Sequence, residues 1–563
     1  MTDVVQHSRP GVILLAALAV VHAPELRSQQ PALVAESVQA QIAAAVAAYR
    51  APQRSSSVDY GATEALRSVY AQRANAPLWS RDGHATPQAQ ALVRELQRAD
   101  TYGLQREDYG GDAIAIAALS GASGSAAADA GRWGRFDVQL SAAALRFMSD
   151  LHYGRVKPTS VGFNLQTMHQ RIDLGASLTA LADATDVGKA INEIEPPFHH
   201  YALLKDALTK YLDLAQHPEL KNLPAISGSV KPGNAYAGAP ALRRLLVALG
   251  DLPAGGGTPA DETTLSPELS AGVRAFQQRH GLTPDGALGK TTFTALTTSF
   301  AKRVRQMDLT LERWRWLPPF HTPPIIVNIP QFRLFAFSTT EDRVANILQM
   351  DVIVGKTYTQ TPVFESDMRY VVFRPYWDIP SSILRKEMLP KIRANPGYVA
   401  AQRLQIVSGQ GDDSPVVPPS PAAIEGLASG KLRLRQMPGP DNALGLVKFM
   451  FPNVYNVYLH STPAHRLFNE SVRAFSHGCI RVSDPPALGT YVMKDEPGGW
   501  TREKIEAAMN GTKTMRVNLQ HPIRVLILYG TALATEAGPV LFFDDLYGLD
   551  KKLEQQLGLA PAK

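Results

Sequence analysis

The sequence predicts a multidomain α+β protein in which helical regions come first and a mainly β region follows. Its 563 residues are enough for three or four domains. Apolar residues recur at helical spacing up to about residue 300, and runs rich in β-branched residues replace them beyond Leu317. The expected segments are a signal peptide over 1–23, a helical scaffold over 32–226, a small helical module over 227–302, a β-rich domain over 303–535 and a tail over 536–563.

The N-terminal run Gly11–Ala23 is apolar but too short to span a bilayer comfortably. Arg9 precedes it, and small residues at Val21 and Ala23 suit a cleavage site. We therefore expect a signal peptide and export, with an uncleaved N-terminal membrane anchor as the alternative.

Charge and cysteine content exclude some classes of protein. The chain has 57 Lys+Arg against 51 Asp+Glu, and these charges are scattered along it. A basic balance suits an anionic partner, but no zinc knuckle, RNP box or basic-zipper pattern is present, so we expect no nucleic-acid partner. With one cysteine, the chain cannot form an internal disulfide.

The region 32–226 is typical of a helical scaffold. Thr86-Pro87 combines an N-cap with proline at the first helical position, and a second helix is expected over Phe136–Leu151. The pair His199-His200 lacks metal-ligand spacing and indicates packing or surface exposure. The helix that begins at Pro87 has an apolar face formed by Ala89, Leu92, Val93 and Leu96.

A Gly-, Pro- and Ala-rich stretch, Ser227–Ala239, separates the scaffold from three short expected helices. The first opens at Pro240, the second at Ser266-Pro267, and the third runs through Phe293. The pattern from Val273 to Leu296, with its Asp285-Gly286 turn, resembles the small peptidoglycan-binding domain. A three-helix module without a ligand is the alternative.

Strands are expected from Ile325 onward, with an interruption between Asp378 and Leu446. That insertion, 378–446, contains a helical piece and a proline-rich loop, and we expect it to be a mobile lid that is not tightly packed. The expected strands are Ile325–Ile329, Phe332–Phe335, Met350–Val354, Tyr370–Phe373, Val454–Leu459 and Ile523–Leu528.

Cys479 is the only cysteine, and it lies nineteen positions after His460, which ends an expected strand. A thiolate is a strong nucleophile, and a nearby histidine and positive charge favour its formation. Cys479 follows Gly478 and is flanked by His477 and Arg481. A catalytic Cys–His pair is therefore favoured over an inert, buried thiol.

Two segments carry a strong family resemblance. His460-Ser-Thr462 followed by Ser476-His-Gly-Cys-Ile-Arg481 resembles the signature of the L,D-transpeptidase catalytic domain. Segments Met368–Phe373, Pro375–Trp377 and Pro438–Gly445 resemble the long periplasmic form of Gram-negative bacteria. Ser461 departs from the Asp or Gly that close relatives often have.

The resemblance and the residues together suggest a mechanism. Cys479 attacks a peptide carbonyl, and His460 accepts the thiol proton and later returns it. Backbone N–H groups of His477, Gly478 and Cys479 are the expected oxyanion donors, and a backbone carbonyl is expected to orient His460. Ser476 is expected to hydrogen-bond within the loop.

Three further residues are expected at the substrate. Arg481 is a candidate for binding the substrate carboxylate or favouring the thiolate, with a structural ion pair as the alternative. His477 is expected either to shape the acceptor side or to pack. Tyr376 and Trp377 are expected either to line the donor groove or to pack in the core.

The resemblance implies a substrate and a location. The substrate would be a peptidoglycan stem tetrapeptide, cut after its third residue and joined to a second stem as a 3→3 cross-link. The expected protein is a periplasmic monomer without metal or cofactor that binds glycan strands, acts with wall synthases or hydrolases, and is acylated by carbapenems. The alternatives are an L,D-carboxypeptidase or cysteine peptidase and a non-catalytic wall-binding protein.

Overall fold

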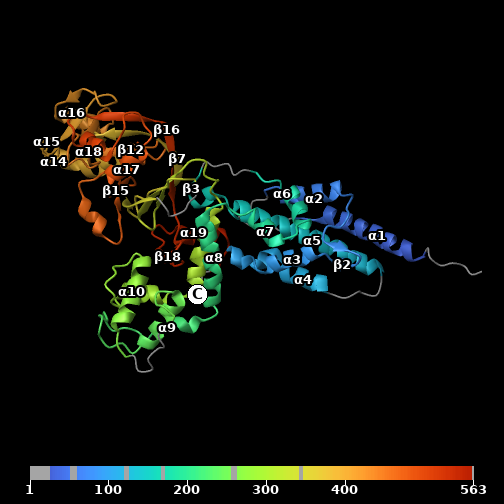
Figure 1. Cartoon of the computed structure of the whole chain (residues 1–563). Coiled ribbons are helices and arrows are strands. Elements are labelled where there is room, and N and C mark those ends of the chain that lie inside the picture. The colour runs from blue at the N-terminus through green and yellow to red at the C-terminus, as the bar shows by residue number, and fades with distance from the viewer. Residues whose placement is uncertain are drawn as a thin grey trace, which may run out of the picture.

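The computed structural model describes residues 26–50, 60–119, 126–165, 171–254, 263–340 and 347–560. A helical arm lies on one side of the β domain and a lid lies at the other end of that domain, while a small helical module lies beside α8 (His199–Leu214), away from the lid (Figure 1). The expected signal peptide lies outside the described residues. No helix in the described ranges is long and apolar enough to cross a membrane.

The helical arm is built around one long helix, α5 (Ala126–Tyr153), which contacts α1, α2, α3 and α6. The predicted start of α3 is confirmed, because the Thr86 side chain accepts a hydrogen bond from the N–H of Ala89 and Pro87 opens the helix. The apolar face of α3 is buried, as expected. The other helices are α1 (Leu26–Ala48), α2 (Ala62–Gln72), α3 (Pro87–Gln97), α4 (Gly111–Leu119), α6 (Leu174–Ala182) and α7 (Val187–Asn192).

The small module has the three expected helices, α9 (Ala239–Leu249), α10 (Pro267–Arg279) and α11 (Lys290–Thr297). Ser266 caps α10 by accepting a hydrogen bond from the N–H of Leu269. The core of the module continues into helices α8 (His199–Leu214) and α12 (Phe300–Trp314). The module is therefore packed against its neighbours and has no separate core.

The central sheet has ten strands and closes on itself, because β12 pairs with both β13 and β7. The order is β12-β13-β15-β6-β5-β4-β16-β7-β3, and β14 pairs with β6. The strands are β3 (Phe163–Asn164), β4 (Ile325–Asn328), β5 (Arg333–Ala336), β6 (Leu348–Gly355), β7 (Val363–Phe373), β12 (Val447–Met450), β13 (Leu459–His460), β14 (Ala474–Ser476), β15 (Ile480–Val482) and β16 (Met515–Leu528). Helices α17 (Pro485–Val492) and α18 (Arg502–Asn510) follow β15.

One predicted strand is largely wrong. Of the expected strand Val454–Leu459, only Leu459 lies in a strand. The Asn453 side chain donates to the carbonyls of Phe451 and Val457 and accepts from two backbone N–H groups, which holds this stretch as a turn. The local hydrogen bonds of Asn453 thus outweigh the strand propensity of the residues that follow it.

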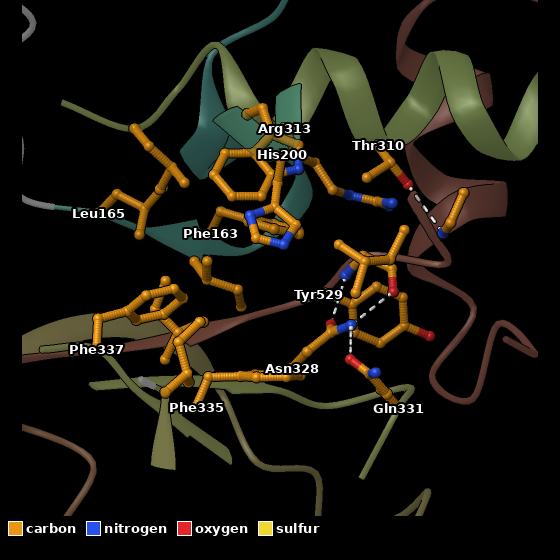
Figure 2. A pocket seen from close by; sticks show the side chains of 18 of the residues that line it. Phe163, Leu165, His200, Thr310, Arg313, Asn328, Gln331, Phe335, Phe337 and Tyr529 are labelled. Carbon is orange, nitrogen blue, oxygen red and sulfur yellow. Dashed lines mark hydrogen bonds between the residues drawn. The ribbon is translucent and has the colours of Figure 1, made fainter. Parts of the chain in front are cut away.

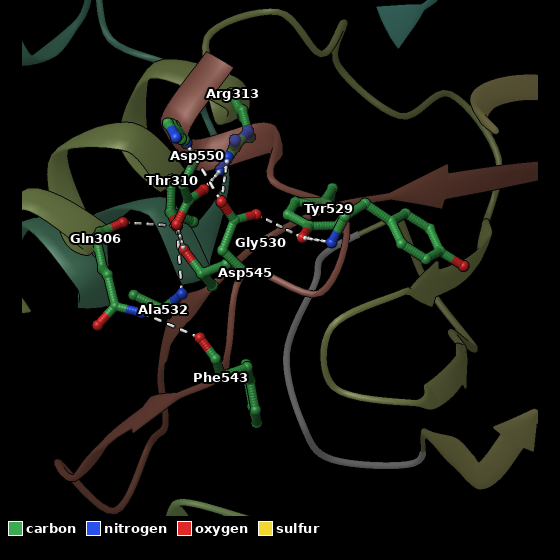
Figure 3. Close-up of polar contacts among 12 residues, drawn as sticks. Gln306, Thr310, Arg313, Tyr529, Gly530, Ala532, Phe543, Asp545 and Asp550 are labelled. Atoms are coloured by element: carbon green, nitrogen blue, oxygen red, sulfur yellow. Dashed lines mark hydrogen bonds and ion pairs between the residues drawn. The ribbon is translucent and has the colours of Figure 1, made fainter. Parts of the chain in front are cut away.

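The segment 536–563, expected as a tail, is folded over its described residues. Strands β17 (Ala532–Ala534) and β18 (Val540–Phe542) form a hairpin, and α19 (Leu549–Gln556) contacts α12. Figure 3 shows the polar contacts that attach this segment to α12, including an ion pair of 2.5 Å between Arg313 and Asp550. Residues 532–556 are therefore part of the folded structure, with the hairpin in the core shared by α8, α10 and α12 and Leu553 of α19 in the core of the β domain.

The lid has its own small core, which corrects the expectation of a loosely packed insertion. Ile392, Ile406, Leu427 and Leu434 are among its buried residues. A four-stranded sheet and four short helices surround this core. They are β8 (Trp377–Asp378), β9 (Leu404–Val407), β10 (Val416–Val417), β11 (Arg433–Gln436), α13 (Ser381–Ile383), α14 (Leu389–Ala394), α15 (Tyr398–Ala401) and α16 (Pro421–Ala428).

Candidate active site

The register of two short parallel strands brings the predicted catalytic residues together. Leu459 of β13 pairs with Ile480 of β15, and His460 pairs with Arg481. Leu459 and Ile480 are fully buried in the core of the β domain. Because successive side chains of a strand point to opposite faces, His460 and Arg481 lie on the other face, together with Cys479.

Cys479 lies on the turn between β14 and β15 and is partly exposed. Gly478, just before it, has a φ of 118°, a conformation that residues with a Cβ rarely adopt. The Cys479 thiol donates to the carbonyl of Asn456, with Sγ and O 3.6 Å apart. Burial raises the pKa of the thiol, while hydrogen bonds from Tyr458 and the charges of Arg481 and Lys448 lower it.

His460 is held in one tautomer by the main chain. Its Nδ1 donates to the carbonyl oxygen of Ser461 at 2.6 Å, which leaves Nε2 to accept a proton. The side chain is 4 % exposed. Burial and the nearby Arg481 charge lower the pKa of His460 to about 3. The thiol and the imidazole are therefore both neutral at rest, and His460 is available as a base.

The turn before Cys479 is fixed by its own hydrogen bonds. Ser476 Oγ accepts from the N–H of Gly478 at 3.1 Å, and Thr361 Oγ1 donates to the carbonyl of Gly478 at 2.8 Å. The hydrogen bond expected of Ser476 within the loop is thus present. Because the Gly478 N–H already donates to Ser476, it is not free as an oxyanion donor, and the N–H groups of His477 and Cys479 remain as candidates.

Arg481 forms no ion pair with the described residues, and its buried Nε has no hydrogen-bond partner among them. Burial lowers the pKa of its guanidinium, while Cys479 raises it. The structure therefore disfavours the structural ion pair and leaves an unpaired cation beside the thiol, which is suited to a carboxylate.

Comparisons with known proteins match the part of the chain that contains this site. Residues 323–498 match a family profile described as "L,D-transpeptidase catalytic domain", which includes His460, Cys479 and most of the sheet. The chain contains an L,D-transpeptidase catalytic domain. Residues 64–208 match a scaffold domain, and residues 238–296 match a "Putative peptidoglycan binding domain". The multidomain α+β architecture predicted from the sequence is confirmed.

A Haemophilus influenzae protein named "Putative L,D-transpeptidase" is 32% identical to this chain over 258 residues. The match covers 46% of this chain and 50% of the relative. The chain thus spans about half the length of the curated relative that it matches.

Two residues near Cys479 of the L,D-transpeptidase domain were not predicted. The Tyr458 ring lies 5.7 Å from that of His460, and Lys448 pairs with His460 across β12 and β13. Lys448 Nζ lies 5.9 Å from the centre of the Tyr458 ring. Burial lowers the pKa of Lys448, whereas Cys479 raises it. A single lysine inside the apolar stretch Val447–Met450 was the signal in the sequence.

Tyr376 and Trp377 lie at the base of the lid. Trp377 forms part of β8 and packs against the lid core, and the Arg435 guanidinium lies 4.1 Å from the centre of the Tyr376 ring. These contacts favour the packing alternative over a direct role in the donor groove. His477 contacts the lid, because its Nε2 lies 2.8 Å from Oε1 of Glu387.

A cavity of about 90 Å³ lies away from this chemistry, between α12 and the sheet (Figure 2). Phe163, Phe335 and Phe337 line it, with Arg313 and His200 at one side. None of Cys479, His460, Arg481, Lys448 and Tyr458 lines this cavity. Among the described residues, no group of three or more His, Cys, Asp or Glu side chains is placed to hold a metal ion.

Proposed function

We propose that this protein is a cysteine L,D-transpeptidase that forms 3→3 cross-links in peptidoglycan. The observation that carries the proposal is the state of the His460 ring. The imidazole is neutral, and its hydrogen bond to the Ser461 carbonyl fixes its tautomer. It lies on the strand face that also carries Arg481, two residues after Cys479. A neutral imidazole with a free Nε2 is the group that a thiol nucleophile needs as its base.

In the proposed first half-reaction, His460 accepts the thiol proton as Sγ of Cys479 adds to the carbonyl of the third stem residue. The N–H groups of His477 and Cys479 would hold the oxyanion, and one such donor is typically worth about 3 kcal/mol of the barrier. As the peptide bond breaks, His460 gives its proton to the departing D-alanine amine, which leaves a thioester on Cys479.

In the proposed second half-reaction, the side-chain amine of a diaminopimelate on another stem attacks the thioester. The C–N bond forms, the C–S bond breaks, and Cys479 returns to the thiol form. Arg481 and Lys448 present positive charge beside Cys479 and would suit carboxylates of the donor stem. The module over 238–296 would hold the enzyme on the wall, and a peptidoglycan substrate supports a periplasmic location.

The test is to incubate the purified protein with disaccharide-tetrapeptides and to identify the products by mass. Cross-linked dimers with loss of D-alanine support the proposal. Tripeptides alone would instead identify an L,D-carboxypeptidase, and unchanged tetrapeptides would identify a wall-binding protein without catalysis.

A further inference from the structure

A glutamate of the lid reaches the catalytic turn of the β domain. Glu387 Oε1 lies 2.8 Å from Nε2 of His477, two residues before Cys479. The two side chains are 45% and 37% exposed, respectively, so a substrate can reach both. The pair therefore joins the lid to the turn that carries Cys479.

The position of Glu387 is set by the lid core. Glu387 lies in a π-helical turn, Leu384–Met388, between α13 and α14. Leu384 and Leu389, on either side of it, are buried in the lid core, while Glu387 is exposed. Such π-helical turns are rare in proteins. Where they occur, they are frequently found at functional sites.

Glu387 is an acidic residue near a nucleophile that has positive charges beside it. Lys448 and Arg481 are cations beside Cys479. An alkyl amine is protonated at neutral pH, with a pKa of about 10.4 for lysine, so these two cations repel an amine acceptor. Glu387 is a carboxylate of opposite sign, and it contacts the turn that carries the nucleophile.

We propose that Glu387 binds the ammonium group of the acyl acceptor and that His477 takes the proton that this group must lose before it attacks. This inference rests on the proposed cysteine acyl transfer and assigns the acceptor side of the same site. Glu387 is thus a specificity-determining residue that favours charged amines over water.

The proposed step balances as follows. The acceptor R–NH3⁺ gives one proton to His477, and Glu387 stabilises the resulting imidazolium. The free amine adds to the thioester carbonyl, a C–N bond forms and the C–S bond breaks, with the sulfur leaving as a thiolate. The second amine proton passes through His460 to the sulfur, and the proton on His477 is released to solvent.

The test uses Glu387→Gln, which keeps a hydrogen-bonding side chain but removes the charge. Glu425→Gln is the matched control, because Glu425 lies on the same lid and pairs with Arg393 at 2.9 Å. Each protein is first acylated with a tetrapeptide donor, and transfer is then measured to a charged stem amine and to hydroxylamine, which is mostly uncharged at neutral pH.

For Glu387→Gln we expect an approximately tenfold loss in kcat/KM for the charged amine, as for one charge-assisted hydrogen bond, with transfer to hydroxylamine and acylation unchanged. Glu425→Gln should match the wild type in all three. Equal losses with both acceptors would show that Glu387 only holds the lid and would overturn the proposal, as would no loss at all.

A failure of the proposed function would give a different result. In that case the wild type would form no acyl-enzyme on Cys479 with the tetrapeptide, and neither acceptor would be consumed. An acyl-enzyme that forms normally but transfers equally well in Glu387→Gln would leave the L,D-transpeptidase chemistry intact and reject only the role of Glu387.

Discussion

His460 donates through Nδ1 to the carbonyl oxygen of its own neighbour, Ser461, at 2.6 Å. This contact takes the place that a carboxylate has in many catalytic triads. A carbonyl orients the ring without adding a negative charge, so it does not strongly raise the basicity of the imidazole. The low pKa of His460, about 3, follows from its burial and from Arg481.

Cys479→Ala is expected to abolish cross-linking and to leave the fold intact, because Cys479 is partly exposed and contributes little to the core. Cys479→Ser should behave in the same way, and His460→Ala should lose most turnover. Product masses report the activity, and thermal melting reports the fold. If Cys479→Ala formed dimers at a comparable rate, Cys479 would not be the nucleophile.

The pH dependence of acylation follows from the pKa of His460. Since this pKa is about 3, the imidazole stays neutral as the pH falls through about 6.5, where an ordinary histidine is protonated. We expect no loss of acylation rate from His460 in that range. The rate should instead rise towards alkaline pH, because burial raises the pKa of the Cys479 thiol.

Arg481→Met removes a positive charge that lowers the pKa of His460 and the pKa of the Cys479 thiol. The pKa of His460 should then rise towards its ordinary value, and the acid limit of activity should move to higher pH. The pKa of the thiol should also rise. Pre-steady-state acylation rates measured against pH test both shifts, and an unmoved acid limit would show that Arg481 does not act on His460.

A carbapenem should acylate Cys479 and raise the intact mass by one drug molecule. The basis is a partly exposed thiol two residues before Arg481, which pairs with the neutral His460 across β13 and β15. Peptide mapping should place the adduct on Cys479 alone, and Cys479→Ala should remain unmodified. An active protein that forms no adduct would contradict an acylable thiol.

Replacing Ser408–Ala422 with a Gly/Ser linker should reduce cross-linking and raise the share of hydrolysed tripeptide, because the thioester is less shielded. The loosely packed lid expected from the sequence would leave thermal melting nearly unchanged. The structure alters that expectation, because the segment includes β10 and carbonyls that accept from Arg433 and Arg435. A loss of about 1–3 kcal/mol, confined to the lid, is expected and can be measured by hydrogen exchange. An unchanged product ratio would show that this segment does not shield the thioester.

Asp550→Ala should destabilise the junction of α12 with the C-terminal segment. Arg313 and Asp550 are 5% and 7% exposed, so removing the carboxylate leaves a buried cation unpaired, at a cost of about 3–5 kcal/mol. The double variant Arg313→Met, Asp550→Ala should recover much of this loss. Denaturant unfolding of the two single variants and the double variant measures the coupling, and additive losses would contradict it.

Local signals in the sequence predicted much of this protein correctly. The helix starts at Thr86-Pro87 and Ser266-Pro267 were predictable because capping depends on neighbours within three residues. The catalytic role of His460 and Cys479 stays a prediction, made from a lone thiol and the motif around it. These residues also carried the resemblance that the family match bears out.

Only the tertiary structure decided what surrounds that pair. The carbonyl that holds His460, the position of Lys448 one strand away and the contact of Glu387 with His477 all depend on strand register and on the docking of the lid. The lid core likewise joins residues from Ile379 to Leu434, which no local pattern relates. Propensity and capping act over a few residues, whereas register and packing are fixed by contacts between distant parts of the chain, and the site chemistry depends on these contacts.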